Sequence, residues 1–255
     1  METEIFCLPA FEDNYIWCLR QENNVAVVDP GDAAPVLDHL AGTGRQLCAI
    51  LITHHHADHT GGIAELTARF QVPVIGPAAE SIAGISQPIA GGDRIEVPGI
   101  TLGFEVIDVA GHTRGHVAYY RRGTLFCGDT LFGCGCGKLF EGTAAQLHAA
   151  LAKFAALPPE TLIYCAHEYT ASGIRFATAV EPDNQAVAER GRRVAQSLAA
   201  GRPTVPFSLA DELATNPFLR CREPAVVRAA ERRLGHQSSN ELEVFATLRQ
   251  WRDNF

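Results

Sequence analysis

The sequence predicts an α/β domain over residues 1–170 followed by an all-α domain over residues 171–255. Up to about residue 170, short apolar runs typical of buried strands alternate with helical patterns. Beyond that point strand signals vanish and helical periodicity dominates. In addition, four of the predicted strands end in loops that carry His or Asp, which is where α/β proteins tend to place their sites.

The N-terminal part of the α/β domain is expected to begin with short strands. Each run is rich in β-branched and aromatic residues and is bounded by turn residues. A helix follows, then a wholly apolar run that predicts a buried strand, and then a second helix with Ile63, Leu66 and Phe70 on one face. In chain order the predicted elements are strands 5–8, 15–19 and 25–28, helix 33–41, strand 48–52 and helix 63–70.

The middle of the chain repeats the same alternation. Thr143 and Gln146 form a capping box that predicts a helix start, and Leu147, Leu151 and Phe154 follow at helical spacing. Strands are predicted on both sides of this helix, at residues 100–109, 124–127 and 161–165.

The C-terminal region is expected to be helical. Residues 184–200 place Val187, Val194 and Leu198 on one face, while the charged residues, Arg190 among them, lie mostly elsewhere. Ser208 with Asp211, and Ser238 with Glu241, predict two further helix starts.

Composition excludes several classes of protein. The formal net charge of −8 over 255 residues disfavours a nucleic-acid partner. No apolar run reaches the roughly 18 residues needed to cross a membrane, so no membrane partner is expected. The N-terminus lacks the basic segment of a secretory signal, and the eight scattered cysteines predict reduced thiols. We therefore expect a cytoplasmic protein, and nothing in the sequence requires more than a monomer.

The most informative segment is the run Thr-His-His-His-Ala-Asp-His at residues 53–59. His54, His56, Asp58 and His59 stand in an H-x-H-x-D-H pattern, and imidazole and carboxylate are the ligands that borderline divalent metals prefer. One tetrahedral ion cannot easily take four side chains from six consecutive residues. The run therefore predicts a two-metal site on a strand-to-helix turn.

Several further segments extend this pattern into a family resemblance. The run at 53–59 resembles the signature of the metallo-β-lactamase fold superfamily. Together with it, the other segments make nearly the whole chain resemble the glyoxalase II (hydroxyacylglutathione hydrolase) family. These segments are Gly-His-Thr-Arg-Gly-His at 111–116, Cys-Gly-Asp-Thr-Leu-Phe at 127–132, Gly-Cys-Gly-Lys-Leu-Phe-Glu-Gly-Thr at 135–143, Tyr-Cys-Ala-His-Glu-Tyr-Thr at 164–170 and Asn-Pro-Phe-Leu-Arg at 216–220.

The resemblance implies an αββα sandwich of two sheets flanked by helices, with a C-terminal all-α domain. It also implies a binuclear centre that holds two divalent metal ions. Zinc is expected, with iron and manganese as the alternatives that the same donors accept. By motif position, one ion takes His54, His56 and His112, the other takes Asp58, His59 and His167, and Asp129 bridges both.

The resemblance further implies the substrate, S-D-lactoylglutathione, which is hydrolysed to D-lactate and glutathione. Lys138, Arg249 and Arg252 occupy the family's glutathione-contact positions, and Tyr169 an aromatic contact position. Phe140 stands where some members carry Tyr, so one hydrogen bond to the substrate is absent. Arg252 stands where others have Lys, which keeps the charge and changes its geometry.

The implied catalytic residues are His54, His56, Asp58 and Asp129, because bound cations lower the pKa of water from 15.7 to about 7 and make hydroxide available at neutral pH. We assign Asp58 to metal binding and water orientation. An alternative chemistry on the same fold is that of a mono-iron persulfide dioxygenase, a class that generally lacks the long C-terminal helical domain. Asp29 is either a turn residue or a group that orients a ligand histidine.

Overall fold

The computed structural model describes residues 3–255. The chain divides into two compact units, each with its own backbone contacts. The N-terminal unit comprises residues 3–108 and 113–128, and the C-terminal unit comprises residues 109–112 and 129–255.

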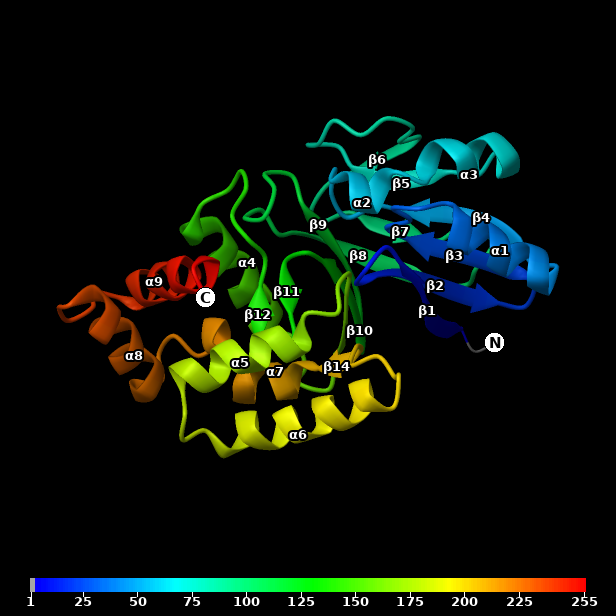
Figure 1. Cartoon of the computed structure of the whole chain (residues 1–255). Coiled ribbons are helices and arrows are strands. Elements are labelled where there is room, and N and C mark those ends of the chain that lie inside the picture. Colours follow the sequence, from blue (N-terminus) through cyan, green and yellow to red (C-terminus); the bar gives the residue numbers. More distant parts are fainter. Residues whose placement is uncertain (1–2) are drawn as a thin grey trace. The chain divides into compact units, whose positions relative to one another are not determined.

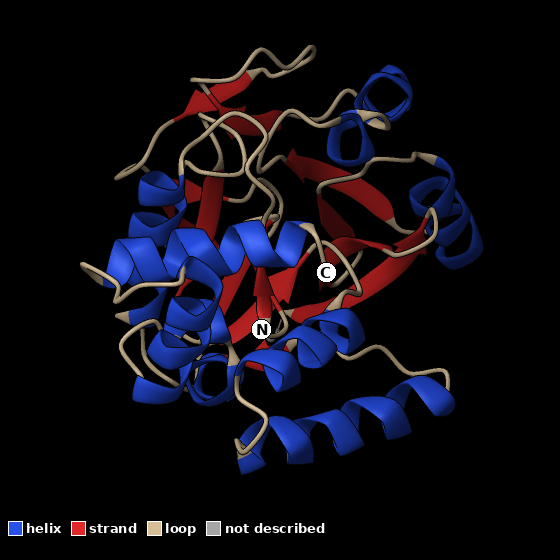
Figure 2. Ribbon diagram, turned by 60° about the vertical axis from the view of Figure 1, so that its left-hand side comes forward, coloured by secondary structure: helices blue, strands red, loops and turns tan. Residues whose placement is uncertain are grey.

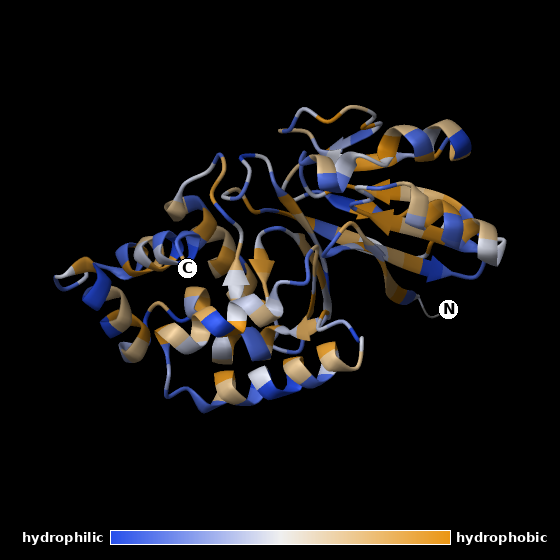
Figure 3. Ribbon diagram, in the orientation of Figure 1, coloured by the Kyte–Doolittle hydropathy of each residue, from blue (hydrophilic) through white to orange (hydrophobic). Residues whose placement is uncertain are grey.

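The N-terminal unit contains a six-stranded mixed sheet with the strand order β1-β2-β3-β4-β5-β6 (Figure 1). Strands β1 to β3 pair antiparallel, whereas β3 to β6 pair parallel. The inner strands are buried on both faces and read as continuous apolar runs, which Figure 3 shows in orange. The strands are β1 (Glu4–Ala10), β2 (Asn14–Gln21), β3 (Asn24–Val28), β4 (Gln46–Leu51), β5 (Val74–Pro77) and β6 (Gln87–Ile89).

Helices cover one face of this sheet. Leu40 of α1 (Ala34–Thr43) and Leu66 of α3 (Ile63–Phe70) are buried in one cluster with Val27 of β3. Each fully buried side chain of this kind contributes about 1.5–3 kcal/mol. The short helix α2 (Ala57–Thr60) precedes α3 and contains the last three residues of the histidine-rich run.

A second, antiparallel sheet lies against the first within the same unit. Tyr119 on β9 (Val117–Arg121) is fully buried, and its hydroxyl donates to the carbonyls of Ile52 and Ile75, at 2.7 and 3.2 Å. This contact ties the two sheets together. In the N-terminal unit the second sheet has the order β10-β9-β8-β7, with β7 (Arg94–Glu96), β8 (Gly103–Asp108) and β10 (Thr124–Gly128).

The C-terminal unit is mostly helical. Among the described residues 170–255 there is one strand, β14, which is two residues long and pairs antiparallel with β13 (Figures 1 and 2). The strands are β11 (Leu131–Phe132), β12 (Gly135–Cys136), β13 (Leu162–Cys165) and β14 (Phe207–Ser208). The helices are α4 (Ala144–Ala155), α5 (Thr170–Val180), α6 (Gln185–Ala199), α7 (Leu209–Thr215), the 3-10 helix η1 (Pro217–Leu219), α8 (Pro224–Leu234) and α9 (Glu241–Asp253).

Most of the predicted elements are present, and the capping box of Thr143 with Gln146 is confirmed at the start of α4. Ser208 caps α7 as expected, but the last helix begins after Asn240 rather than Ser238, because Asn240 accepts the backbone N–H of Glu243. The prediction that strand signals end near residue 170 misses β14, which is too short to produce an alternating pattern.

Helix α6 departs from the prediction in two side chains. Leu198 is 40% exposed near the end of the helix, whereas Arg190 is only 3% exposed, and α6 alternates apolar and polar patches along its length in Figure 3. Arg190 is buried because a carboxylate partner, Glu212, lies opposite it. Within residues 3–255, no helix combines the length and the apolar character that crossing a membrane requires.

Candidate metal centre and adjoining cavity

The histidine-rich run of the N-terminal unit begins in the loop after β4 and continues into α2, which contains Asp58 and His59. Nε2 of His54 lies 3.1 Å from Nδ1 of His56, and Nε2 of His59 lies 3.4 Å from Oδ2 of Asp58. His54 and His59 are fully buried, while Asp58 is partly exposed. The strand-to-helix turn therefore gathers two pairs of donor atoms from a short stretch of chain, as the sequence predicts.

Asp29, at the end of β3, orients two of these histidines. Its carboxylate accepts the backbone N–H and the hydroxyl of Thr53, each at 2.7 Å, and lies 3.1 Å from Nδ1 of His59. Because the Thr53 hydroxyl proton points to Asp29, the Thr53 oxygen accepts Nδ1–H of His54 at 3.0 Å. The ring of His54 thus keeps the lone pair on Nε2 for a metal, which is how ligand histidines are usually oriented.

Asp58 is held by contacts that the sequence does not signal. The side-chain amide of Asn14, the first residue of β2, donates to Oδ2 of Asp58 at 3.0 Å. Gly31 makes room on the other side, because a Cβ at this residue would lie 1.8 Å from the carbonyl oxygen of Asp58. Asn14 follows an ordinary turn in the sequence, so no local pattern distinguishes it.

Two further histidines, His55 and His116, contact residues around the run. His55 Nδ1 lies 2.9 Å from Glu80 Oε2, and the other oxygen of Glu80 accepts the N–H of Gly115 at 3.0 Å and the hydroxyl of Thr113. The ring of His116 stacks on that of His54 with a centroid distance of 4.6 Å. Glu80 is a further residue that sequence reasoning misses, since it lies in a loop with no metal motif.

The C-terminal unit presents a second donor set around one carboxylate. Oδ2 of Asp129 lies 3.4 Å from Nε2 of His112, and Oδ1 lies 3.4 Å from Nε2 of His167. All three side chains are at least 90% buried. A carboxylate whose two oxygens face two different imidazoles has the arrangement of a ligand shared between two ions.

The environment of this second set also orients its rings. Nδ1 of His112 donates to the carbonyl of Lys138 at 2.8 Å, which leaves the lone pair of Nε2 toward Asp129. The ring of Tyr169 stacks on His167 with a centroid distance of 4.8 Å. Gly137 permits the close approach of this loop, because a Cβ there would lie 2.1 Å from the carbonyl oxygen of Asp129.

The donor atoms fit divalent metal ions. Two ligands that each lie about 2.0–2.1 Å from a tetrahedral ion are about 3.4 Å apart. The four donor pairs within the two units are separated by 3.1–3.4 Å. Each unit therefore carries a cluster of His and Asp whose composition and spacing suggest divalent metal binding.

Comparison with protein families agrees with this chemistry. A family model described as the metallo-beta-lactamase superfamily matches residues 11–167, and one described as the hydroxyacylglutathione hydrolase C-terminus matches residues 168–255. The chain belongs to the hydroxyacylglutathione hydrolase family. Its fold is the metallo-β-lactamase fold with a C-terminal helical domain, so the predicted fold class is confirmed.

Relatives match over their full length. The hydroxyacylglutathione hydrolase of Dechloromonas aromatica is 56% identical, with 99% of each chain covered. That of Alkalilimnicola ehrlichii is 54% identical over 98% of this chain and 99% of the relative. Among solved structures, ETHE1 from Myxococcus xanthus superposes with a TM-score of 0.67 at 24% identity, over 98% of this chain and 90% of that chain. This last likeness is one of fold alone.

Beside the second donor set, the C-terminal unit has a cavity of about 250 Å³. Four of the five residues that the sequence predicts as substrate contacts line it: Lys138, Tyr169, Arg249 and Arg252. The fifth, Phe140, is 61% exposed and does not line this cavity. Its ring meets that of His112 edge-on at 5.3 Å, and the Lys138 ammonium lies 5.6 Å from its centroid.

The two arginines of this cavity differ in their partners. Nη1 of Arg249 donates to the carbonyl of Cys136 at 2.8 Å, and Nη2 to Asp253 at 3.0 Å, so this buried guanidinium is largely used within the protein. Arg252 donates to the hydroxyl of Ser172 at 2.7 Å. Burial, with the positive charges of Arg249 and Arg175, lowers the pKa of Arg252, so an anion in the cavity would relieve an excess of positive charge.

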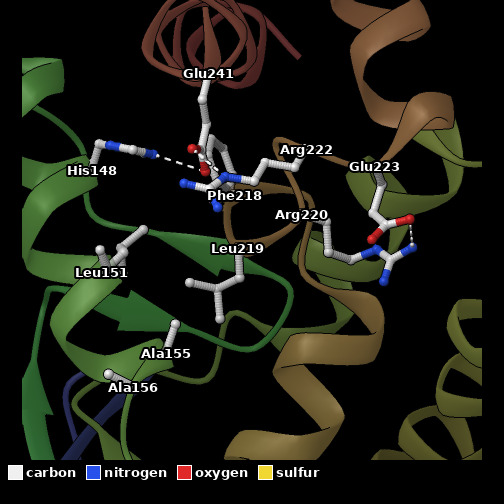
Figure 4. Close-up of a pocket in the computed structure, with 11 residues that line it drawn as sticks. His148, Leu151, Ala155, Ala156, Phe218, Leu219, Arg220, Arg222, Glu223 and Glu241 are labelled. Atoms are coloured by element: carbon white, nitrogen blue, oxygen red, sulfur yellow. Dashed lines mark hydrogen bonds and ion pairs between the residues drawn. The ribbon is translucent and has the colours of Figure 1, made fainter.

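A larger cavity of about 420 Å³ lies elsewhere in the C-terminal unit, between α4, α9 and the segment after η1. Figure 4 shows His148 and Glu241 pointing toward each other across it, with 3.4 Å between Nε2 and Oε1. Its cationic groups already face carboxylates of the same rim, since Arg222 pairs with Glu241 and Arg220 contacts Glu223. None of the predicted site residues lines this cavity.

Proposed function

We propose that this protein hydrolyses S-2-hydroxyacylglutathione thioesters, with S-D-lactoylglutathione as the substrate and D-lactate and glutathione as the products. This reaction is the second step of methylglyoxal detoxification. The observation that carries the proposal is the matched C-terminal family segment, whose residues Arg249 and Arg252 line a cationic cavity next to the donor set around Asp129.

The proposed metal centre takes seven protein ligands. One ion would be held by His54, His56 and His112, the other by Asp58, His59 and His167, and Asp129 would be shared by both. Zinc is the proposed metal, with iron or manganese as alternatives, because imidazole and carboxylate accept all three. The fixed Nε2 lone pairs of His54 and His112 and the two-sided contacts of Asp129 support this assignment.

When bound, two divalent ions supply a Lewis acid for the thioester carbonyl and lower the pKa of water toward about 7. The protein supplies the geometry. Asn14 holds the Asp58 carboxylate, which we assign to metal binding and water orientation. The leaving thiol has an ordinary pKa near 8.5, so it departs as a thiolate and requires no strong general acid. One water is consumed, and the products are a carboxylate, a thiol and a proton.

The glutathione moiety is assigned to the cavity in the C-terminal unit. Glutathione carries two carboxylates, and Lys138 and Arg252 offer the cationic partners. Tyr169 offers an aromatic wall that is stacked on the ligand histidine His167. Because Arg249 is held by backbone carbonyls, we assign it mainly to shaping the cavity rather than to a bidentate contact with substrate.

The remaining assignments follow from the same family. We propose a catalytic domain over residues 1–170 and a helical substrate-binding domain over residues 171–255, in a monomeric cytoplasmic protein with no nucleic-acid partner. A mono-iron persulfide dioxygenase is disfavoured because the hydroxyacylglutathione hydrolase segment spans residues 168–255.

The direct test follows hydrolysis of S-D-lactoylglutathione at the thioester absorbance, before and after chelation. We expect turnover that a chelator abolishes and that added divalent metal restores. Turnover that withstands metal removal, or none in the metal-loaded protein, would exclude the proposal. Oxygen uptake with glutathione persulfide, and no thioester hydrolysis, would favour the dioxygenase instead.

A further inference from the structure

One wall of the 250 Å³ cavity is a very small hairpin. Phe132, Gly133, Gly135 and Cys136 line the cavity and belong to β11, β12 and the two-residue turn between them. A hairpin of this size has little stability of its own. The shape of the cavity wall therefore depends on what holds the hairpin from behind.

The turn of this hairpin is strained and tightly packed. Cys134 has a φ of +54°, a left-handed conformation that is unfavourable for a non-glycine residue. On one side the turn presses on α5, where a Cβ at Gly173 would lie 2.0 Å from the carbonyl oxygen of Gly133. A strained turn keeps its conformation only when surrounding groups fix it.

A buried ionic network supplies those groups. Oε2 of Glu212, on α7, accepts the backbone N–H of Cys134 at 3.0 Å. The same oxygen accepts the side-chain amide of Asn216 at 2.7 Å, and that amide also donates to the carbonyl of Gly135 at 2.9 Å. Nη2 of Arg190, on α6, lies 2.5 Å from Oε1 of Glu212. The hairpin is thus bound through its own backbone, in the turn and at the first residue of β12.

This network consists of charged and polar side chains that are almost completely buried. Glu212 and Asn216 are fully buried, and Arg190 is 3% exposed. Burial raises the pKa of Glu212, against the opposing effect of the Arg190 charge. A buried ion pair seldom stabilises more than well-packed apolar side chains of similar volume, so its use here points to geometry rather than stability.

We propose that Glu212, held by Arg190 and acting with Asn216, is a positioning residue that sets the cavity wall formed by the 131–136 hairpin and thereby the affinity for the glutathione moiety. The identity of the ligand rests on the function proposed above. Because Glu212 and Asn216 bind the backbone of the hairpin, the network is expected to act on binding and not on the chemical step.

The test compares three variants of the metal-loaded full chain. Glu212→Gln removes the charge and keeps the shape, and the double variant Arg190→Met/Glu212→Leu removes both charges. Arg193→Met is the matched control, because Arg193 also lies on α6 and pairs with α7 through Asp211 at 2.8 Å, but is exposed. The measurements are the Kd of glutathione by calorimetry, KM and kcat for S-D-lactoylglutathione, and thermal unfolding.

We expect Glu212→Gln and the double variant to raise Kd and KM about tenfold, the loss of roughly one charge-assisted hydrogen bond, with kcat within about twofold. The double variant is expected to melt at a lower temperature, because Glu212→Leu leaves the buried N–H of Cys134 without its acceptor. Arg193→Met is expected to leave every parameter within about twofold. Unchanged Kd and KM in both variants, or a fall in kcat at unchanged Kd, would overturn the positioning role. If neither variant folds, the network serves folding and the role is likewise rejected.

These outcomes are separable from the fate of the proposed function. A wild-type protein that neither binds glutathione nor hydrolyses its thioesters contradicts the function itself. A wild-type protein that does both, with variants that behave identically, contradicts the positioning role alone.

Discussion

The two units present their proposed metal donors in opposite ways. In the N-terminal unit, one continuous run from His54 to His59 sits on a single strand-to-helix turn. In the C-terminal unit, His112, Asp129 and His167 come from three separate segments and meet around one carboxylate. A compact motif therefore identifies the chemistry, whereas a dispersed set depends on the fold to assemble it.

The supports of the two sets differ as well. The N-terminal donors are oriented by side chains, chiefly Asp29 and Asn14. The C-terminal donors are oriented by a backbone carbonyl, that of Lys138, and by the stacked ring of Tyr169. The C-terminal supports also belong to the cavity, so metal binding and substrate binding share residues in that unit but not in the other.

The largest effect is expected from Asp129→Ala. If this carboxylate is shared by both ions, its loss weakens both sites, and kcat/KM falls about a thousandfold or more. Metal analysis of the purified variant should show that both ions are depleted. Full metal content with near-normal turnover would contradict the bridging role.

Asp29→Ala tests the side-chain support of the N-terminal set. Loss of a group that orients ligand histidines typically costs about 10–100-fold in metal affinity or activity. We expect weaker metal binding in a chelator competition, with restored turnover at high metal concentration. Asp32→Ala is the control, because Asp32 lies in the same loop and its carboxylate accepts the N–H of Ala34 at 2.9 Å, a contact local to the start of α1. Equal metal affinity in the two variants would contradict the orienting role of Asp29.

These two predictions also mark what the sequence could and could not provide. His54, His56, Asp58 and His59 follow from their spacing alone, and the family resemblance adds His112, Asp129 and His167. The sequence does not predict the roles of Asn14 and Glu80, because the first residue of a strand and a loop carboxylate look ordinary until tertiary contacts bring them to the run. Arg190 was expected on the polar side of α6, since periodicity does not reveal a buried partner on another helix.

Arg252→Met tests whether the cavity acts in substrate binding rather than in the chemical step at the proposed metal centre. Removal of one cationic contact to a carboxylate should raise KM for S-D-lactoylglutathione about tenfold and leave kcat nearly unchanged. Arg249→Met should also lower the melting temperature, because its guanidinium holds the carbonyls of Cys136 and Gly137. Steady-state kinetics and thermal unfolding of both variants separate the two roles. A fall in kcat without a change in KM for Arg252→Met would contradict the assignment.

The smallest effect is expected from Phe140→Tyr. A hydroxyl at this exposed ring restores the contact that some family members have, which is about one net hydrogen bond at a partly solvated place. KM should fall about threefold, with unchanged metal content. An unaltered KM would place Phe140 outside the substrate contacts.

The most direct test of the shared two-metal centre is a reconstitution of the metal-free protein, in which metal content and thioester hydrolysis are followed in the same sample. We expect activity to rise until about two ions are bound per chain and then to level off. Full activity with one ion per chain, or activity independent of metal, would contradict the shared centre.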